Sequence, residues 1–417
     1  MHFRLRLDLL CASFAVALTA LACSSSDASP TSETVGATSQ KIVKGKVSAE
    51  DQDAVVLIVH SDFSTYFAAC TGTMLAPNLV LTARHCVSET VEAAFGCDAK
   101  GNLITDGQGG GKAGKDFAAS TLHIYNGNTR PDFEVRNPPK GVIGAKIIHD
   151  GAKALCSHDL ALILLAEPVE GAVISPIRLD TPPEANELMT AIGWGVTTTT
   201  PFPDKRQQRS GIKVVHVGPF SQGPDQVPPN DFEVGEVICQ GDSGGPSIAE
   251  STGAVIGVVS RGGNGRSSAT DPAAGCLGTD TVNNYTQVAP FKDMILSAFE
   301  EAGQEPWLEG GPDPRLAKLG EDCTGGESCR SNLCSDGKCT QDCSTDACPD
   351  GFECKPSGDQ KFCKAKSAAS SGCAAAPTRV SSTSPLQTIA ALGAVAFLVT
   401  ASRRSRSRSR RDRNRSY

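Results

Sequence analysis

Aromatic side chains are scarce in this chain of 417 residues, which holds two Trp, four Tyr and fifteen Phe. Glycine and proline are frequent by comparison, with 42 and 25 residues. This balance disfavours a bundle of long helices and favours short strands joined by many turns. The length predicts two or three domains, and a hydrophobic content of 39% can supply at least one large core.

Positive charge exceeds negative charge only at the end of the chain. The formal net charge is −7, yet residues 403–417 hold eight Arg and one Asp and carry +7, so the rest carries −14. An acidic body lacks the basic surface that binds nucleic acid. We therefore expect no nucleic-acid partner, although an Arg/Ser tail taken alone would be compatible with one.

No apolar run reaches the roughly 20 residues that a helix needs to cross a bilayer. The run from Leu9 to Ala22 follows Arg4 and Arg6 and ends in small residues. This order is typical of a signal peptide over residues 1–22. It predicts an exported protein, at the cell surface or outer envelope or secreted. A buried N-terminal helix is the alternative.

Residues 23–41 are rich in Ser, Thr and Ala and lack the apolar groups that a core requires. We interpret them as a pro-segment that ends at Lys41. Cys23 directly follows the predicted signal peptide, so a lipid-bearing cysteine is an alternative there. Against it, Ala20 stands where lipoprotein signals usually carry Leu.

A second apolar run, residues 385–402, precedes the Arg-rich tail 403–417. The positive-inside rule would hold that tail on the inner side. Ser371-Gly372-Cys373 lies upstream, in a polar linker over residues 365–384. This order of parts resembles the MYXO-CTERM type of sorting signal, which implies that Cys373 becomes the mature end, attached to the membrane or cell envelope. A plain transmembrane tail anchor is the alternative.

Residues 303–320 form a linker rich in Gly and Pro, and residues 321–364 form a Cys-rich module. The module lacks His and any Cys-x-x-Cys pair, which disfavours zinc and favours four disulfides. Their connectivity stays open. A binding role and a role as a protease-resistant spacer are both compatible with it. Its cysteines are Cys323, Cys329, Cys334, Cys339, Cys343, Cys348, Cys354 and Cys363.

Residues 42–302 form the main globular segment. Short β-rich runs alternate with turns there, while Phe291 to Phe299 has helical spacing. Residues 100–115, rich in Gly and Lys, are expected to form a surface loop. The runs are 54–60, 79–81, 141–148, 160–166, 211–217 and 254–260.

Three short motifs in this segment carry chemistry, in the order His, Asp, Ser. They are Leu81-Thr82-Ala83-Arg84-His85-Cys86, then His158-Asp159-Leu160-Ala161-Leu162, then Gly241-Asp242-Ser243-Gly244-Gly245-Pro246. A serine hydroxyl becomes nucleophilic when an imidazole accepts its proton and a carboxylate orients that imidazole. Each motif alone is weak evidence. Together they predict that Ser243, His85 and Asp159 are catalytic.

The three motifs resemble the chymotrypsin/trypsin family of serine proteases, over residues 42–302. The resemblance implies an all-β fold of two antiparallel β-barrels with a C-terminal helix and the triad in the cleft between the barrels. The small disulfide-rich module and the hydrophobic segment would follow it. The implied activity is that of a serine endopeptidase on protein or peptide substrates. We expect no cofactor and no metal.

The resemblance also implies how the enzyme is switched on. An activating protease would cut after Lys41, and the new amine of Ile42 would pair with the Asp242 carboxylate. That pairing would shape an oxyanion hole made by the N–H groups of Gly241 and Ser243. Lys44 departs from the family pattern, which has glycine at this place.

Six cysteines lie in the protease segment. The resemblance implies disulfides Cys70–Cys86 and Cys239–Cys276. Cys97 and Cys156 remain, and we predict that they pair with each other.

The resemblance places the substrate pocket at Val237, Ile238, Ser260 and Gly262. A carboxylate that would pair with Lys or Arg is missing at Val237. We therefore expect an apolar or small residue at P1, the residue whose carbonyl is attacked. Arg261 replaces a usual Trp beside this pocket, and Asp280 lies near its other wall. A surface-anchored binding or adhesion protein that uses a protease-like fold is the alternative function, as is an anchored scaffold for the Cys-rich module.

Overall fold

The computed structural model describes residues 42–366, apart from 62–66, 92–94, 106, 108, 134–138, 198–202, 224, 269 and 272. The predicted signal peptide, the pro-segment with Cys23 and Lys41, Cys373, the sorting helix and the Arg-rich tail lie outside these residues. No helix within the described part of the chain is long and apolar enough to cross a membrane.

Six strands of the N-terminal half close into a barrel in the order β10-β11-β4-β3-β2-β9. Every pairing is antiparallel, and the apolar side chains of β2, β4 and β11 fill the interior. These are the segments whose β-branched runs predicted strands. The strands are β2 (Val55–Ser61), β3 (Phe67–Ala76), β4 (Leu79–Thr82), β9 (Leu122–Tyr125), β10 (Val142–Ile148) and β11 (Ala161–Leu165).

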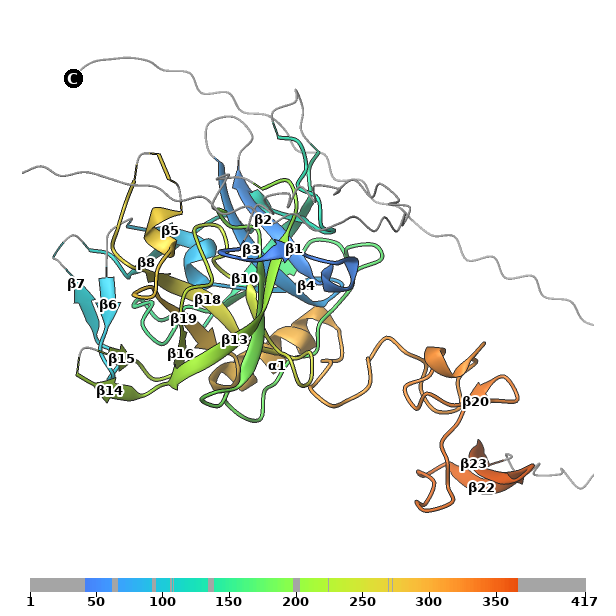
Figure 1. Cartoon of the computed structure of the whole chain (residues 1–417). Coiled ribbons are helices and arrows are strands. Elements are labelled where there is room, and N and C mark those ends of the chain that lie inside the picture. Colours follow the sequence, from blue (N-terminus) through green and yellow to red (C-terminus); the bar gives the residue numbers. More distant parts are fainter. Residues whose placement is uncertain are drawn as a thin grey trace, which may run out of the picture. The chain divides into compact units, whose positions relative to one another are not determined.

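A second six-stranded barrel follows, in the order β13-β12-β17-β18-β19-β16, and the pairing of β16 with β13 closes it. The short β1 (Lys46–Val47) adds to the outer side of β13. The predicted fold class of two antiparallel barrels is confirmed (Figure 1). The strands are β12 (Leu188–Gly193), β13 (Gln207–Val217), β16 (Asp231–Val234), β17 (Pro246–Ala249), β18 (Val255–Gly263) and β19 (Val282–Gln287).

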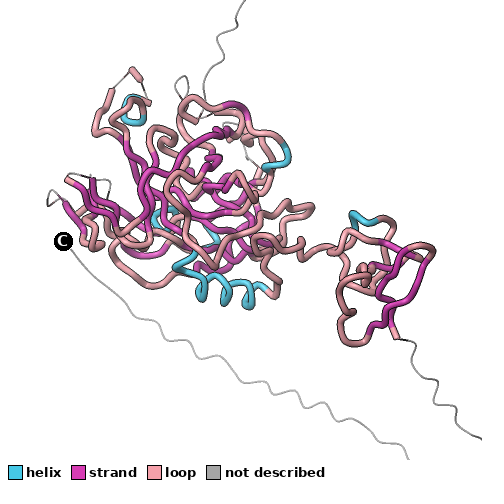
Figure 2. Tube along the Cα trace, turned by 60° about the horizontal axis from the view of Figure 1, so that its bottom comes forward, coloured by secondary structure: helices cyan, strands magenta, loops and turns pink. Residues whose placement is uncertain are grey.

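One α-helix, α1 (Lys292–Ala302), ends the protease segment, as the spacing of its apolar residues predicted. Gly303 terminates it in the left-handed conformation, with φ 66°. Ile295 and Phe299 of α1 share one core cluster with Leu81 of the first barrel and Val258 of the second. The helix therefore contacts both barrels, at the periphery of the strands (Figure 2, cyan).

Residues 100–115, expected to be a surface loop, instead contain regular strands. β6 (Phe95–Cys97) pairs with β7 (Leu103–Thr105), and β5 (Ser88–Thr90) pairs with β8 (Ala113–Asp116). A third small hairpin joins β14 (Phe220–Gln222) to β15 (Asp225–Val227). Gly and Lys disfavour strands, but here the backbone pairing with β5 and β6 outweighs that preference.

The expected linker 303–320 is bound to the protease in its first part. Ile177 N–H donates to the Trp307 carbonyl at 2.9 Å, and Glu309 N–H donates to the Ile177 carbonyl at 3.0 Å. The Glu309 carboxylate also accepts two hydrogen bonds from the Arg178 guanidinium, at 2.7 and 2.8 Å. Residues 307–309 are thus part of the protease surface.

The Cys-rich module consists of two similar halves, each with two disulfides and one hairpin. Cys323–Cys334 and Cys329–Cys339 surround β20 (Cys334–Ser335) and β21 (Lys338–Cys339). Cys343–Cys354 and Cys348–Cys363 surround β22 (Phe352–Ser357) and β23 (Gln360–Ala365). The eight cysteines form four disulfides, which supply the stability that so small a core cannot.

Arg206, just before β13, is fully buried and joins the two barrels. Its guanidinium donates to Ser48 Oγ (2.9 Å) and to the carbonyls of Ala49 (3.0 Å) and Val55 (2.7 Å). It also donates to the Gly127 carbonyl and forms an ion pair with Asp53. A buried cation is stable only when its donors are satisfied, and the segment that leads into β2 satisfies these.

We predict that Arg206→Met destabilises the protein by about 3 kcal/mol or more, because the carbonyls and the Asp53 carboxylate lose their donor. The measurement is urea unfolding in a Ser243→Ala background, which lacks the expected nucleophile. Lys213→Met, which replaces an exposed cation on β13, is the matched control and should change stability by less than about 0.5 kcal/mol. Equal stabilities of the two variants would contradict this role of Arg206.

Candidate active site

Strand pairing in the first barrel brings His85 and Asp159 together. His85 lies in the short helix η2 (Arg84–Cys86), directly after β4, and Asp159 lies two residues before β11. Thr82 at the end of β4 pairs with Ala161 at the start of β11. His85, which follows β4, and Asp159, which precedes β11, therefore lie at the same end of the barrel.

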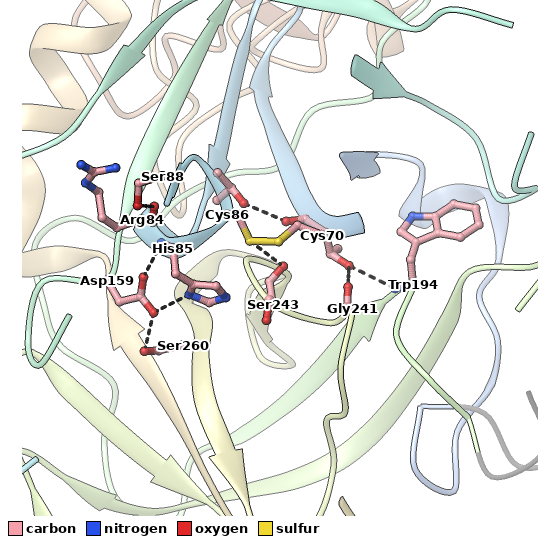
Figure 3. Close-up of a disulfide and its surroundings, with 12 residues drawn as sticks. Cys70, Arg84, His85, Cys86, Ser88, Asp159, Trp194, Gly241, Ser243 and Ser260 are labelled. Carbon is pink, nitrogen blue, oxygen red and sulfur yellow. Dashed lines mark hydrogen bonds and ion pairs between the residues drawn. A yellow bond between two sulfur atoms is a disulfide. The ribbon is translucent and has the colours of Figure 1, made fainter. Parts of the chain in front are cut away.

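The Asp159 carboxylate is fully buried and accepts three hydrogen bonds. Its Oδ2 lies 2.8 Å from His85 Nδ1 and accepts from Ser260 Oγ at 2.7 Å, while Oδ1 accepts from the His85 backbone N–H at 2.9 Å (Figure 3). Both the ring and the backbone of His85 are thereby fixed. Ser260 belongs to β18, so the second barrel contributes one of the three donors.

Burial and pairing act in opposite directions on these two groups. Burial disfavours the charged imidazolium, but the adjacent Asp159 charge and hydrogen bond outweigh burial and hold the pKa of His85 above 6.5. Burial likewise opposes ionisation of Asp159, yet the His85 ring and the Ser260 hydroxyl keep its pKa below 3.8. The pair thus favours an ionised Asp159 and a His85 that binds a proton readily.

Ser243 lies in the second barrel, on the loop before β17. Figure 3 shows the His85 ring turned toward the Ser243 side chain, and both residues line a cleft of about 460 Å³. Thr71 of β3 holds this loop against the first barrel. Its N–H donates to the Ser243 carbonyl and its hydroxyl to the Gly241 carbonyl, each at 2.8 Å.

Asp242, the neighbour of Ser243, is a second fully buried carboxylate. It accepts hydrogen bonds from the backbone N–H groups of Cys239 (2.9 Å) and Gly195 (2.8 Å). A Cβ on Gly195 would lie 2.4 Å from Asp242 Cγ, so only glycine fits there. Burial raises the pKa of Asp242 to about 7, because the two amides only partly replace water. No ion pair to Asp242 occurs within the described part of the chain.

Ile42 and Val43 are fully buried in the second barrel. Ile42 shares a cluster with Val237, and Val43 shares one with Cys239, so both lie beside the loop that carries Asp242. Ile42 has φ 41° and Lys44 has φ 64°, the left-handed region that non-glycine residues rarely adopt. The positive φ of Lys44 explains why the family usually has glycine at this position. The Lys44 Nζ forms an ion pair with the Glu236 carboxylate at 2.5 Å.

The primary pocket has a volume of about 700 Å³, and Ile238, Ser243, Ser260 and Gly262 line it. Val237 was expected in this pocket but is not among its lining residues, because it is fully buried in the adjoining barrel core. Asn283 also lines the pocket. A Cβ at position 262 would lie 2.0 Å from Asn283 Oδ1, so only glycine fits there.

Two ion pairs flank this pocket. Arg261 Nη1 lies 2.7 Å from the buried Asp231 Oδ2. Burial raises the pKa of Asp231 to about 6, although the Arg261 charge opposes this. Arg266 and Asp280 form an exposed pair at 2.5 Å, so neither charge stands alone beside the pocket.

Three disulfides join Cys70 to Cys86, Cys97 to Cys156 and Cys239 to Cys276. Cys70 and Cys86 lie near His85, and their sulfur atoms and a His85 nitrogen lie within 4.8 Å of one another. Because those two sulfurs share a disulfide, they are not thiolate ligands for a metal.

One residue of the site, Thr71, and one contact of another, Ser260, escaped the sequence analysis. Thr71 follows Cys70 in a strand and has no distinguishing motif, and only the structure shows its contacts with the Ser243 loop. Ser260 was expected in the substrate pocket, which it lines, but it also donates to Asp159. Neither contact has a signal in the local sequence, because each joins the two barrels.

We predict that Asp242 makes the continuous chain less stable as pH rises. Its folded pKa, about 7, lies above its unfolded value near 3.8. The folded state therefore binds the extra proton, and this stabilisation is present below about pH 4 and lost through pH 7. Relative to Asp242→Asn, wild type should lose about 3 kcal/mol between pH 5 and pH 8. Urea unfolding in the Ser243→Ala background measures it, and a constant difference would contradict the assignment.

Comparison with known proteins agrees with this geometry. The sequence model of the trypsin family matches residues 42–295. The snake venom serine protease KN3 of Trimeresurus stejnegeri is 26% identical over 271 residues, which cover 62% of this chain and 88% of the relative. A trypsin of Saccharopolyspora erythraea is 24% identical, over 61% of this chain and 96% of the relative. The kallikrein 1-related peptidase b3 of Mus musculus is 26% identical, over 46% and 69%. Since the family match spans more than half of the sequence, the chain belongs to the trypsin family of serine endopeptidases.

Proposed function

We propose that Ser243 is the nucleophile, His85 the general base and Asp159 the residue that orients His85. The observation that carries this proposal is the His85 ring, held by the buried Asp159 on one side and turned toward Ser243 on the other (Figure 3). A fixed Nδ1–H bond to Asp159 leaves Nε2 as the proton acceptor, which is the tautomer that catalysis requires.

The reaction follows from these positions. Ser243 Oγ attacks the substrate carbonyl while its proton passes to His85 Nε2, and the Asp159 charge stabilises the imidazolium that forms. The imidazolium then protonates the leaving amine, and an acyl-enzyme ester remains on Ser243. Water, activated by the same His85, hydrolyses the ester and regenerates the hydroxyl.

The N–H groups of Gly241 and Ser243 are proposed to stabilise the negative oxygen of the tetrahedral intermediate. Gly241 has φ 95°, a conformation that only glycine adopts freely and that can turn neighbouring amides toward one point. Loss of one such donor raises a barrier of this kind by about 3 kcal/mol.

Cleavage after Lys41 is proposed to activate the enzyme. Asp242 is a buried carboxylate held by amides alone, and Ile42 is buried beside its loop in a conformation that a β-branched residue rarely adopts. Cutting the peptide bond before Ile42 removes the constraint on φ and creates an ammonium group. Pairing of that group with Asp242 would compensate the buried charge.

The protein is proposed to be exported and to act outside the cytoplasm, either secreted or held at the envelope. Seven disulfides in the described residues require an oxidising compartment. The predicted signal peptide and the predicted sorting signal at Cys373 support this proposal, and one relative is named as a protease of snake venom.

We predict that a fluorophosphonate probe labels protein cut after Lys41, and labels neither the uncut chain nor cut Ser243→Ala. Labelling and intact-mass analysis measure this. Equal labelling of the uncut chain would support the assignment of Ser243 but contradict activation by cleavage after Lys41. A folded, cut sample that stays unlabelled would contradict the assignment of Ser243 and favour a binding role.

We predict that cut enzyme prefers an apolar or small residue at P1, because the pocket wall offers Ile238 and no unpaired carboxylate among its described residues. A panel of peptides that differ only at P1 measures kcat/KM. Ile238→Asp, which places a carboxylate among the residues that line the pocket, should raise the ratio of kcat/KM for Arg over Leu. Cleavage fastest after Arg in the wild-type enzyme would contradict the expected preference.

A further inference from the structure

The mechanism above makes no use of Asp231, a fully buried carboxylate at the start of β16. Its Oδ2 lies 2.7 Å from Arg261 Nη1, and the Arg261 side chain is itself only 12% exposed. Asp231 and Arg261 therefore form an ion pair inside the second barrel. Either charge alone would be strongly unfavourable there, because water does not replace the missing partner.

A bulge in β18 brings the Arg261 side chain beside Ser260. Neighbouring side chains of a regular strand point to opposite faces. The pairing of β18 with β19 shifts register between Val259 and Arg261, so no residue of β19 lies directly opposite Ser260. Such a bulge redirects side chains. As a result, Arg261 Nη1 lies 3.5 Å from Ser260 Oγ.

The hydrogen bonds from Arg261 to Asp159 run in one direction. Ser260 Oγ carries one proton, which it donates to Asp159 Oδ2 at 2.7 Å. Toward Arg261 it can therefore only accept, over a contact that is at the long end of the hydrogen-bond range. A cation on the acceptor side of a hydroxyl polarises the O–H bond and makes it a stronger donor. The Arg261 charge thus strengthens the bond from Ser260 to Asp159.

Asp231 fixes the position of the Arg261 charge. It accepts the short hydrogen bond of 2.7 Å from the same Nη1 that contacts Ser260. Thr286, which lies opposite Asp231 on β19, is uncharged. The other titratable groups around the pair are Asp159, Glu233 on β16 and His216 on β13, which lies 3.3 Å from Glu233.

The ionisation of Asp231 decides whether the guanidinium is held. Burial raises the pKa of Asp231 to about 6, although the Arg261 charge opposes this. Above this value the carboxylate is charged and binds Arg261, and below it protonation removes that charge. This titration is separate from that of His85, whose pKa is held above 6.5 by Asp159.

We infer that Arg261 is a positioning residue for the reaction, held by Asp231 so that its charge supports the Ser260 hydroxyl. Ser260 passes this support on to Asp159, and Asp159 orients His85. Arg261 stands where the family usually has Trp, so the ion pair is a departure of this chain from the family pattern. The inference rests on the proposed function of the triad and adds to it a group that acts through another residue.

The test removes the ion pair as a whole, because a single buried charge left without its partner destabilises the fold. Arg261→Met combined with Asp231→Asn gives the pair-free enzyme. Cut after Lys41, it should cleave a quenched peptide with Leu at P1 with a kcat about fivefold below that of wild type. In a Ser260→Ala background the same change should lower kcat less than about twofold, since the group through which Arg261 acts is gone.

The pH dependence of kcat distinguishes positioning from a merely structural role. The advantage of wild type over the pair-free enzyme should fall from about fivefold at pH 8 to less than about twofold at pH 5, where Asp231 is protonated. Arg261→Lys keeps a cation beside Asp231 and should lose less kcat at pH 8 than the pair-free enzyme does.

Lys146→Met combined with Glu301→Gln is the matched control. This exposed ion pair of 2.8 Å joins β10 to α1, outside the residues that line the cleft. Its removal should leave kcat at the wild-type value at both pH values.

Fluorophosphonate labelling shows whether each cut enzyme has a working triad. Labelled variants in which loss of the pair and Ser260→Ala act additively on kcat overturn this inference and leave the triad intact. A wild-type advantage that does not change with pH does the same. Cut and folded wild-type protein that stays unlabelled contradicts the proposed function and this inference with it.

Discussion

The burial of the Asp159 carboxylate is the constraint on which the cleft depends. A charge without water is tolerated only when protein donors replace the solvent. Two of its three donors come from His85 in the first barrel, and the third comes from Ser260 in the second. The barrels must therefore meet in one arrangement. Thr71 forms a second link between the barrels, because this residue of β3 in the first barrel donates hydrogen bonds to the Ser243 loop of the second.

The three fully buried carboxylates among the described protease residues differ in what replaces their water, and their pKa values follow the difference. Asp159, with the His85 ring and two further donors, has a lowered pKa. Asp231, paired with the single guanidinium of Arg261, reaches about 6. Asp242, with two backbone amides, reaches about 7. The same burial thus gives an ion in one place and a group near its titration point in another, according to the charge beside it.

The catalytic motifs are local patterns, and their resemblance to the trypsin family implied the fold class, with which the local apolar patterns agree. Alternating apolar runs marked β2, β4, β10, β11 and β18, and the spacing from Phe291 to Phe299 marked α1. Gly241 and Gly244 both adopt positive φ angles in the loop around Ser243, at positions where the motif has glycine.

What the sequence did not reveal depends on contacts between distant segments. Residues 100–115 look like a loop by composition, yet they contain strand residues that pair with β5 and β6. Asp231 has no motif, and its contact with Arg261 exists because β16 and β18 both pair with β19. Burial and register decide such contacts, and neither is encoded in a short stretch of sequence.

The anchoring of residues 48–55 by Arg206 has a consequence for the chain end that cleavage would create. β1 is already paired with β13, so Ile42 stands only four positions before the fixed Lys46. Such a tether spans at most about 14 Å. The new amine would stay within that radius of its attachment, at an effective concentration on the order of millimolar or higher. Its insertion is then a unimolecular step, whose rate does not depend on the protein concentration.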